Sequence, residues 1–240
     1  MDAVNNGAEK NLRKGVFPWH LKSVQDAIIM NIIKDCKGML IGEVGGGDTR
    51  ILPALAKLNK VYNIEKFQGA DGGPDNELTF KDVNNIQCWV GDSKGQIRDS
   101  FFDILFSVSV VEHVPTNALS GFIEDCARIL KPGGQMFHAV DLYLTQPDYK
   151  FNGVHYTHVG HTKIQAYQEA FKSGLFEPLG KIEINNKEDL EFKPQYISNP
   201  DNIMTQWNKV APKLADLRDN AQSVTLLWAG RKPSEMQYLK

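Results

Sequence analysis

The chain has 240 residues, of which 42% are hydrophobic and 23% are charged, and its formal net charge is −2 at pH 7. These values are ordinary for a globular protein and exclude disorder on a large scale. Because Lys and Arg are spread along the chain, no surface for duplex nucleic acid or an anionic membrane is expected, and a small molecule is the expected partner.

The cysteines indicate a reducing compartment. Cys36, Cys88 and Cys126 are odd in number, lie far apart and stand in apolar segments, so they suggest neither a disulfide framework nor a metal site. The first residues lack the apolar stretch of a signal peptide, and no apolar run approaches the length of a membrane span. We therefore expect a cytoplasmic protein without a membrane segment.

Apolar runs of strand character alternate with helical patterns, which predicts an α/β protein whose mostly parallel sheet is covered by helices on both faces. We expect one domain, made of an N-terminal helical segment (1–36), a core (37–184), an insertion (186–222) and a final strand (223–232). The expected strands span residues 37–44, 60–67, 85–92, 102–110, 135–143, 178–184 and 223–232.

Apolar residues three and four positions apart predict three helices, and a further helical stripe of Met204, Trp207, Val210 and Leu214 in the insertion is broken near Pro212. The second of the three helices is capped by Thr116 and stops at Pro132, and the third spans residues 163–173 with Thr162 as its cap. The first is amphipathic, and its apolar face consists of Val24, Ile28, Ile29 and Ile32.

A glycine-rich turn, GEVGGGDTR (42–50), follows the first expected strand. In an open parallel sheet, ligands bind beyond the carboxyl ends of the strands, and this turn makes the close contact. The dinucleotide pattern GxGxxG would use Gly45 and Gly47 but meets Arg50 in place of its third glycine, which disfavours NAD. The carboxylate of Glu43 suits a ligand that carries an ammonium group.

The acidic-x-Gly-x-Gly pattern resembles motif I of the class I S-adenosylmethionine-dependent methyltransferases, with Thr49 in place of the last glycine. Further motifs of small-molecule methyltransferases follow in order: VYNIEKF, GDS, FDILFSVSVVEHV, LKPGGQMFHAVDLY and THVGHTKIQAYQEAFKSGLFEP. The resemblance covers about 37–184 and the final strand. It implies a Rossmann-like, doubly wound sheet of seven strands with an antiparallel last strand, and S-adenosylmethionine as cofactor.

The resemblance also assigns roles to individual residues. It implies that Glu65 accepts hydrogen bonds from the ribose hydroxyls and that Asp92 accepts one from the adenine amine. The complete set of cofactor-binding residues that it implies is Glu43, Gly45, Gly47, Glu65, Lys66, Asp92, Ser93, Ser107 and Val108.

The expected reaction is methyl transfer to the oxygen or nitrogen of a small-molecule acceptor. The sulfonium already activates the methyl group, so the protein contributes alignment, exclusion of water and, for a hydroxyl acceptor, a general base. His113 is the first candidate for this base, and His138 and Asp141 follow. The N-terminal segment and the insertion are expected to form a helical lid over the acceptor.

A metal site is not expected. His155, His158 and His161 are spaced by three residues, which would suit a metal on a helix, but the neighbouring Gly153 and Gly160 indicate a loop.

Two other interpretations stay open. The GGGD run also resembles the glycine turn of aminopropyltransferases, whose chemistry needs carboxylates after the fourth strand, where this chain offers only Glu112. A degenerate, non-catalytic cofactor-binding subunit of the same fold is favoured by Thr49, whereas the presence of Glu65 and Asp92 speaks against it.

Overall fold

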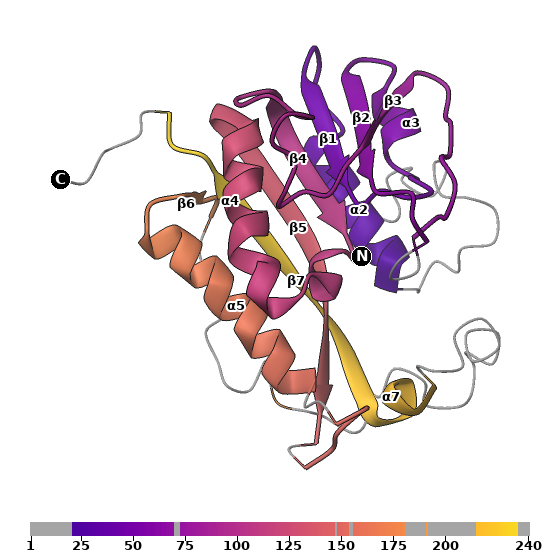
Figure 1. The fold of residues 1–240 in the computed structure, drawn as a ribbon, viewed down its shortest axis with the longest axis vertical. Helices are drawn as coiled ribbons and strands as arrows, with labels where there is room; N and C mark the ends of the chain where they lie inside the picture. Colours follow the sequence, from indigo (N-terminus) through magenta and orange to yellow (C-terminus); the bar gives the residue numbers. More distant parts are fainter. Residues whose placement is uncertain are drawn as a thin grey trace.

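The computed structural model describes residues 21–69, 73–146, 148–153, 156–180, 191 and 215–234. Within them, a central sheet lies between two layers of helices (Figure 1). The helices are α2 (Leu21–Ile33), α3 (Leu52–Leu55), the 3-10 turns η3 (Val111–His113) and η4 (Thr116–Ala118), α4 (Leu119–Ile129), α5 (Tyr156–Lys172) and α7 (Ala215–Asn220). The strands are β1 (Leu40–Val44), β2 (Lys60–Glu65), β3 (Val83–Gln87), β4 (Phe102–Val108), β5 (Leu130–Thr145), β6 (Glu177–Pro178) and β7 (Ala221–Arg231).

The seven strands follow the order β3-β2-β1-β4-β5-β7-β6. Pairs among β1 to β5 are parallel, whereas β7 runs antiparallel between β5 and β6. The chain thus reverses its strand order at β1 and β4, where the carboxyl ends of neighbouring strands diverge. The predicted class, a doubly wound seven-stranded sheet with an antiparallel last strand, is confirmed. The expected strand 178–184 is reduced to β6 where the structure describes it, and residues 181–184 lie outside the described residues.

Each face of the sheet has its own hydrophobic core. Side chains of α4 and α5 pack on one face around Leu105 and Met136, and side chains of α2 and α3 pack on the other around Ile104 and Phe106. The alternation along β4 sends successive side chains to opposite faces, so almost every position of this strand is buried.

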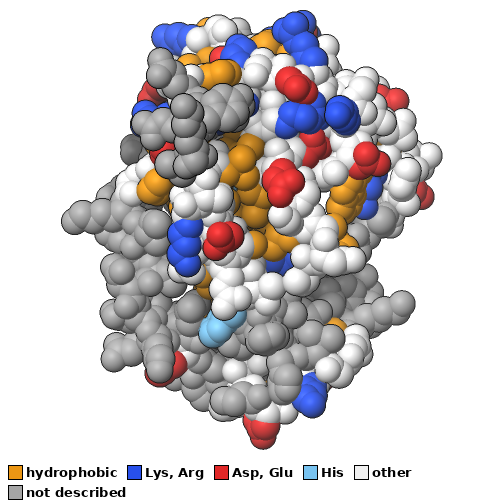
Figure 2. Space-filling model, turned by 60° about the vertical axis from the view of Figure 1, so that its left-hand side comes forward, with side chains coloured by type: hydrophobic (Ala, Val, Ile, Leu, Met, Phe, Trp, Pro, Cys, Tyr) orange, Lys and Arg blue, Asp and Glu red, His pale blue; other side chains and the backbone are white. Residues whose placement is uncertain are grey.

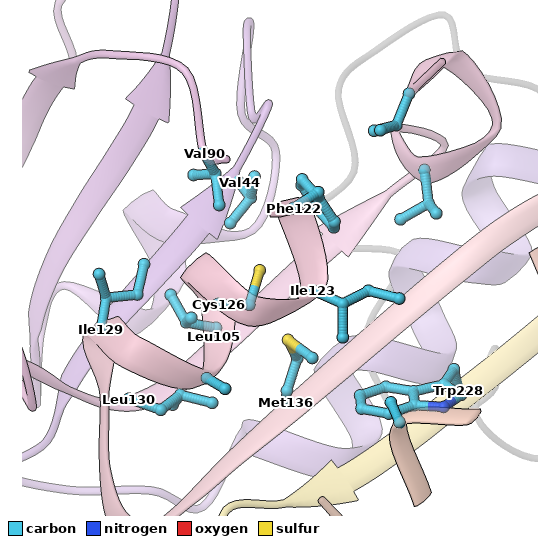
Figure 3. Packing of buried hydrophobic residues seen from close by; sticks show 14 of the residues in the cluster. Val44, Val90, Leu105, Phe122, Ile123, Cys126, Ile129, Leu130, Met136 and Trp228 are labelled. Carbon is cyan, nitrogen blue, oxygen red and sulfur yellow. The ribbon is translucent and has the colours of Figure 1, made fainter. Parts of the chain in front are cut away.

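Helix α4 shows how the first core is built. Phe122, Ile123, Cys126 and Ile129 extend from the helix toward the strands, where Leu105 and other strand residues meet them (Figure 3). Their spacing of three and four residues places them on one side of the helix, as the sequence indicates. The helix ends at Ile129, directly before β5.

The sequence assigns the wrong face to α2. Val24 and Ile32 are 37% and 39% exposed, whereas Gln25 and Asp26 are buried. The reason is that the first half of the helix covers the polar carboxyl ends of the strands, where Gln25 and Asp26 find hydrogen-bonding partners. Only the second half, with Ile29 and Ile33, packs into the apolar core.

Two expected helix starts are also wrong. Helix α5 begins at Tyr156, so Gly160 lies inside a helix and Thr162 is no cap; Gly160 is accommodated because it faces the side chain of Leu142. Thr116 lies in η4 and makes no capping bond to α4, whose first turn follows directly from the 3-10 turn. Of the expected lid segments 1–36 and 186–222, residues 1–20, 186–190 and 192–214 lie outside the described residues; the described parts contain α2 and α7, and the last two residues already belong to β7.

Candidate functional site

A cavity of about 430 Å³ opens at the carboxyl ends of β1, β2 and β4. Its volume falls in the range of about 300–1,000 Å³ that small-molecule sites occupy. Figure 2 shows one face of the molecule on which hydrophobic side chains lie in a recess bordered by acidic ones. Among the residues with an expected ligand role, Glu43, Gly45, Gly47, Glu65, Lys66, Val108 and His113 line the cavity.

The glycine turn after β1 forms the floor of the cavity, and its backbone needs glycine. Gly45 and Gly47 have φ angles of +63° and +50°, a region that other residues enter at a cost. A side chain on Gly46 would also collide, because its Cβ would lie 2.5 Å from Oδ1 of Asn63. Asn63, inside β2, donates a hydrogen bond of 3.0 Å to the carbonyl of Gly47 and so fixes the turn from below.

Thr49 takes a structural part that a third glycine could not fill. Its hydroxyl donates to the carboxylate of Glu43 and accepts a hydrogen bond of 3.2 Å from the amide of Leu52, at the start of α3. The hydroxyl thereby holds the buried carboxylate and satisfies an amide at the start of the helix.

Arg50 joins the glycine turn to α2. Its guanidinium forms a two-fold ion pair with the buried carboxylate of Asp26, at 2.5 Å from Nε and 3.0 Å from Nη2. Arg50 lines the cavity, and so does Lys22, which lies one turn before Asp26 in α2. Lys22 of the N-terminal helix and Arg50 of the glycine turn therefore form a cationic wall of the cavity.

Glu43 is buried, and burial raises the pKa of its carboxyl group to about 8, although the hydrogen bond from Thr49 lowers it. In the folded protein the group keeps a proton that the unfolded chain releases above pH 4.5. Stability therefore falls as the pH rises from about 4.5 to about 8, because only the unfolded state gains from ionisation in this window.

We expect urea unfolding to show this loss, which is on the order of 5 kcal/mol because one pKa unit corresponds to about 1.4 kcal/mol. A Glu43→Gln variant, which cannot ionise, is the comparison. As the pH rises, the unfolding free energy of the wild type is expected to fall relative to that of the variant. A difference that stays constant from pH 5 to pH 8 would contradict the assignment.

The opposite wall of the cavity comes from β2 and from the segment after β3. Glu65 ends β2, is only 8% exposed, and accepts a hydrogen bond of 2.7 Å from the amide of Lys66 through Oε1. The Nζ of Lys66 lies 4.4 Å from the centre of the Trp89 ring, and both residues line the cavity. Pro74 closes this side above Gly47, with its Cδ 3.3 Å from the position that a Cβ there would take.

The end of β4 forms the third wall. Ser109 has a φ of +53°, a strained conformation for a residue with a side chain, and its hydroxyl donates to Gln25 at 2.8 Å. Gln25 in turn donates to the carboxylate of Asp141 and to the hydroxyl of Thr225. One side chain of α2 thus connects the residue after β4 with residues inside β5 and β7. His113 follows in η3, where 49% of its side chain is exposed.

Other residues with an expected role lie away from the cavity. The hydroxyl of Ser107 lies 2.6 Å from Nδ1 of His138, and both side chains are fully buried. Burial lowers the pKa of His138 to about 3, so its ring is neutral at physiological pH. Asp141 and Asp92 do not line the cavity either, and Asp92 is exposed. Ser93 is buried against α4.

Several lining residues were not foreseen from the sequence. In the sequence Arg50 stands out only as a misfit in a dinucleotide motif, and no pattern indicates a role for Trp89 or Pro74. Asn63 carries the clearest missed signal, since a polar residue inside the apolar run VYNIE has to find a partner.

Cys36, Cys88 and Cys126 are free thiols. Among the described residues, no cluster of His, Cys, Asp and Glu could hold a metal ion, and no helix is long and apolar enough to cross a membrane. The side chains of His155 and His158 are not among those described, so the expectation of no metal site stays a prediction. Gly160 lies inside α5, so the loop expected at this position does not form.

Residues 42–138 match the family model described as methyltransferase domain. This match confirms the resemblance that the motifs indicate, and its range contains the glycine turn, the end of β1 and the whole of β2, β3 and β4. No curated protein matches the sequence.

Solved structures share the fold at low sequence identity. A candidate methyltransferase from Bacillus halodurans C-125 is 16% identical, with a TM-score of 0.51, over 86% of this chain and 98% of that one. A structure of the Haloferax volcanii Trm112 methyltransferase activator with its candidate methyltransferase gives 18% identity and a TM-score of 0.55 over 99% of each chain. The [4+2]-cyclase SpnF is 13% identical, with a TM-score of 0.54, over 98% of this chain and 93% of that one. At these identities the likeness shows the fold alone.

Proposed function

We propose that this chain, whose residues 42–138 match the methyltransferase-domain family model, transfers the methyl group of S-adenosylmethionine to an oxygen or nitrogen of a small-molecule acceptor. One observation carries the proposal. Glu43, Gly45, Gly47, Glu65, Lys66 and Val108, all expected from the motifs to contact the cofactor, line a single cavity at the switch point of the sheet.

The lining residues fit the chemical groups of this cofactor. The carboxylate of Glu65 would accept from the ribose hydroxyls, and the cationic wall of Lys22 and Arg50 would attract the carboxylate of the methionine part. The buried carboxyl of Glu43 would ionise beside the ammonium group. The glycine turn keeps the floor free of side chains, and Thr49 preserves its geometry, which favours a working site over a degenerate one.

When bound, S-adenosylmethionine supplies a methyl group on a positively charged sulfur. The protein then has to align the acceptor, exclude water and, for a hydroxyl, take up its proton. His113 is our candidate for the proton acceptor, because it lines the cavity beyond the end of β4. His138 is excluded from this role in our proposal, because its ring is buried and its pKa is low.

We place the reaction in the cytoplasm, and we assign the lid over the acceptor to residues 1–36 and 186–222. Free thiols suit a reducing compartment, and Lys22 already brings the N-terminal segment to the cavity wall. The acceptor is a small molecule in this proposal, because the cavity has the size of a small-molecule site.

The proposal is tested by calorimetric titration with S-adenosylmethionine, S-adenosylhomocysteine and NAD⁺, followed by an assay of methyl transfer to panels of small hydroxyl and amine compounds. We expect the protein to bind the first two ligands, not to bind NAD⁺, and to methylate at least one compound of the panels. Binding without any turnover would favour a non-catalytic subunit, and transfer of an aminopropyl group would favour the polyamine alternative. Failure of the folded protein to bind either adenosyl ligand would refute the proposal.

A His113→Ala variant tests the proton acceptor. For a hydroxyl acceptor we expect kcat to fall by about 10²-fold to 10⁴-fold, the usual contribution of a general base, with unchanged affinity for S-adenosylhomocysteine. A His161→Ala variant, whose exposed side chain lies on α5 outside the cavity, is the matched control. Equal activity of the two variants would remove His113 from the mechanism.

A further inference from the structure

The turn that follows β3 is held from below by a single carboxylate of α4. Oδ2 of Asp125 accepts hydrogen bonds from the amide of Gly91 at 2.7 Å, from the amide of Ser93 at 3.1 Å and from the hydroxyl of Ser93 at 2.7 Å. Asp125 is nearly buried, at 9% exposure. Three donors on one buried oxygen fix the backbone on both sides of Asp92.

Arg128, one turn further along α4, completes this arrangement. Its Nε donates to Oδ1 of Asp125 at 2.8 Å, and its Nη2 donates to the hydroxyl of Ser93 at 2.8 Å. Its Nη1 reaches the carbonyl of Ile97 at 2.9 Å and the carboxylate of Asp99 at 2.6 Å. The pair therefore ties the whole segment 91–99 to the helix. We call Asp125 and Arg128 the α4 clamp.

Asp125 is negatively charged in this arrangement. Burial alone raises its pKa, but the hydrogen bonds from Gly91, Ser93 and Arg128 outweigh this effect and bring the pKa below its ordinary value. Hydrogen bonds to a charged acceptor contribute more than neutral ones, so the turn is held strongly.

The clamped turn is continuous with the cavity wall. Trp89 and Val90 line the cavity directly before Gly91. The amide of Asp92 donates back to the carbonyl of Trp89 at 3.1 Å, and Gly91 has a φ of +118°. A Cβ on Gly91 would lie 2.8 Å from Nε1 of Trp89, so the turn and the Trp89 ring fit closely together. A shift of the turn would move this wall.

We propose that the α4 clamp positions the turn 89–93 and thereby sets the selectivity of the cavity for the adenine base. This inference rests on the proposed function, because it assumes that an adenosyl ligand occupies the cavity. Asp125 and Arg128 are positioning residues, since neither carboxylate nor guanidinium lines the cavity. Their effect passes through the backbone of Gly91 and Ser93 to the wall and to the side chain of Asp92.

The test compares binding of S-adenosylhomocysteine with binding of S-inosylhomocysteine, in which a carbonyl oxygen replaces the amine of the base. We expect wild-type protein to prefer the adenine compound by about tenfold, since a hydrogen bond from the amine to the charged carboxylate of Asp92 is lost and a carbonyl oxygen faces that carboxylate instead. In Asp125→Asn, one amide replaces an acceptor that serves three donors. The preference is expected to drop to within about twofold, together with a loss of affinity for S-adenosylhomocysteine.

Asp103→Asn is the matched control. Asp103 also accepts from a backbone amide, that of Leu40 at 2.8 Å, and from a cation, Lys131 at 2.7 Å, but it stands at the opposite end of the strands. This variant is expected to lose stability without any change in the preference for adenine. Ser93→Ala removes one side-chain donor and keeps the backbone bonds, so it is expected to fold and to show an intermediate preference.

The outcomes separate the two proposals. If wild-type protein binds S-adenosylhomocysteine and the Asp125→Asn and Ser93→Ala variants keep the wild-type preference, the clamp proposal is overturned and the proposed function stands. If Asp125→Asn does not fold, the Ser93→Ala preference decides alone. If the wild-type protein binds neither compound, both proposals fail.

Discussion

Replacement of Glu65 by alanine is expected to weaken binding of S-adenosylhomocysteine by at least about a hundredfold. The carboxylate ends β2 inside the cavity, and charge-assisted hydrogen bonds to two ribose hydroxyls contribute about 1.5–3 kcal/mol each. Because the amide of Lys66 takes only Oε1, the carboxylate retains the acceptor capacity that the sugar requires. Calorimetric titration measures the effect directly.

Glu169→Ala is the control for this variant, because Glu169 is an exposed carboxylate on α5 outside the cavity. Its affinity is expected to equal that of the wild type. Glu65→Gln keeps the volume and loses the charge, so an intermediate affinity would identify the charge as the cause. Wild-type affinity in Glu65→Ala would show that the ligand lies elsewhere.

Replacement of Gly45 by alanine is expected to abolish ligand binding and to destabilise the fold by about 2–4 kcal/mol. Two costs add up. The residue has a φ of +63°, and its new Cβ would lie 2.7 Å from Cγ2 of Val110. Because both residues line the cavity, relief of the clash would move the floor or the wall of the site. Thermal unfolding and calorimetry report the two effects.

Two further variants separate these costs. Gly174→Ala places the same methyl group at a φ of +74° in open space, so it is expected to show the backbone cost alone. The double variant Gly45→Ala with Val110→Ala removes the clash and keeps the strain, and its stability is expected to approach that of Gly174→Ala. If Gly45→Ala binds ligand as wild type does, the glycine turn is not the floor of the site.

The sequence contains most of the fold because buried parallel strands are nearly continuous in apolar residues. β4 shows this plainly, since both its faces are covered and its ends are marked by charged or polar residues. The glycine turn could also be predicted from the sequence, because Gly45 and Gly47 adopt positive φ angles that only glycine reaches without strain. These features depend on local backbone demands, which a sequence expresses directly.

The buried face of α2 was not predictable by the same means. Periodicity assigns apolar residues to the core, but Gln25 and Asp26 are buried because strand ends from elsewhere in the chain supply their partners. The α4 clamp was missed for a related reason. Asp125 and Arg128 look like an ordinary pair of charges on a helix surface until the segment 91–99 folds against them.

His138 shows the limit of assigning roles from strand positions. It lies in β5, the strand next to β4, and this place in the sequence made it a candidate for proton transfer. Its side chain, however, points to the buried face of the sheet, where the ring lies beside Tyr167 and Trp228. A shift of one residue along a strand changes the face, and only the register decides which face a histidine occupies.

The position of β7 has a consequence for the order in which this protein forms during synthesis. The strand is drawn from residues 221–231, yet it lies inside the sheet and pairs with β5 from Gln135 to Thr145. When only the first 200 residues have been synthesised, β7 is still missing, and β5 is therefore an unpaired edge strand of the sheet. Such an edge is long and apolar, the kind that pairs with other chains. Pairing of β7 with β5 is therefore the step that closes this edge.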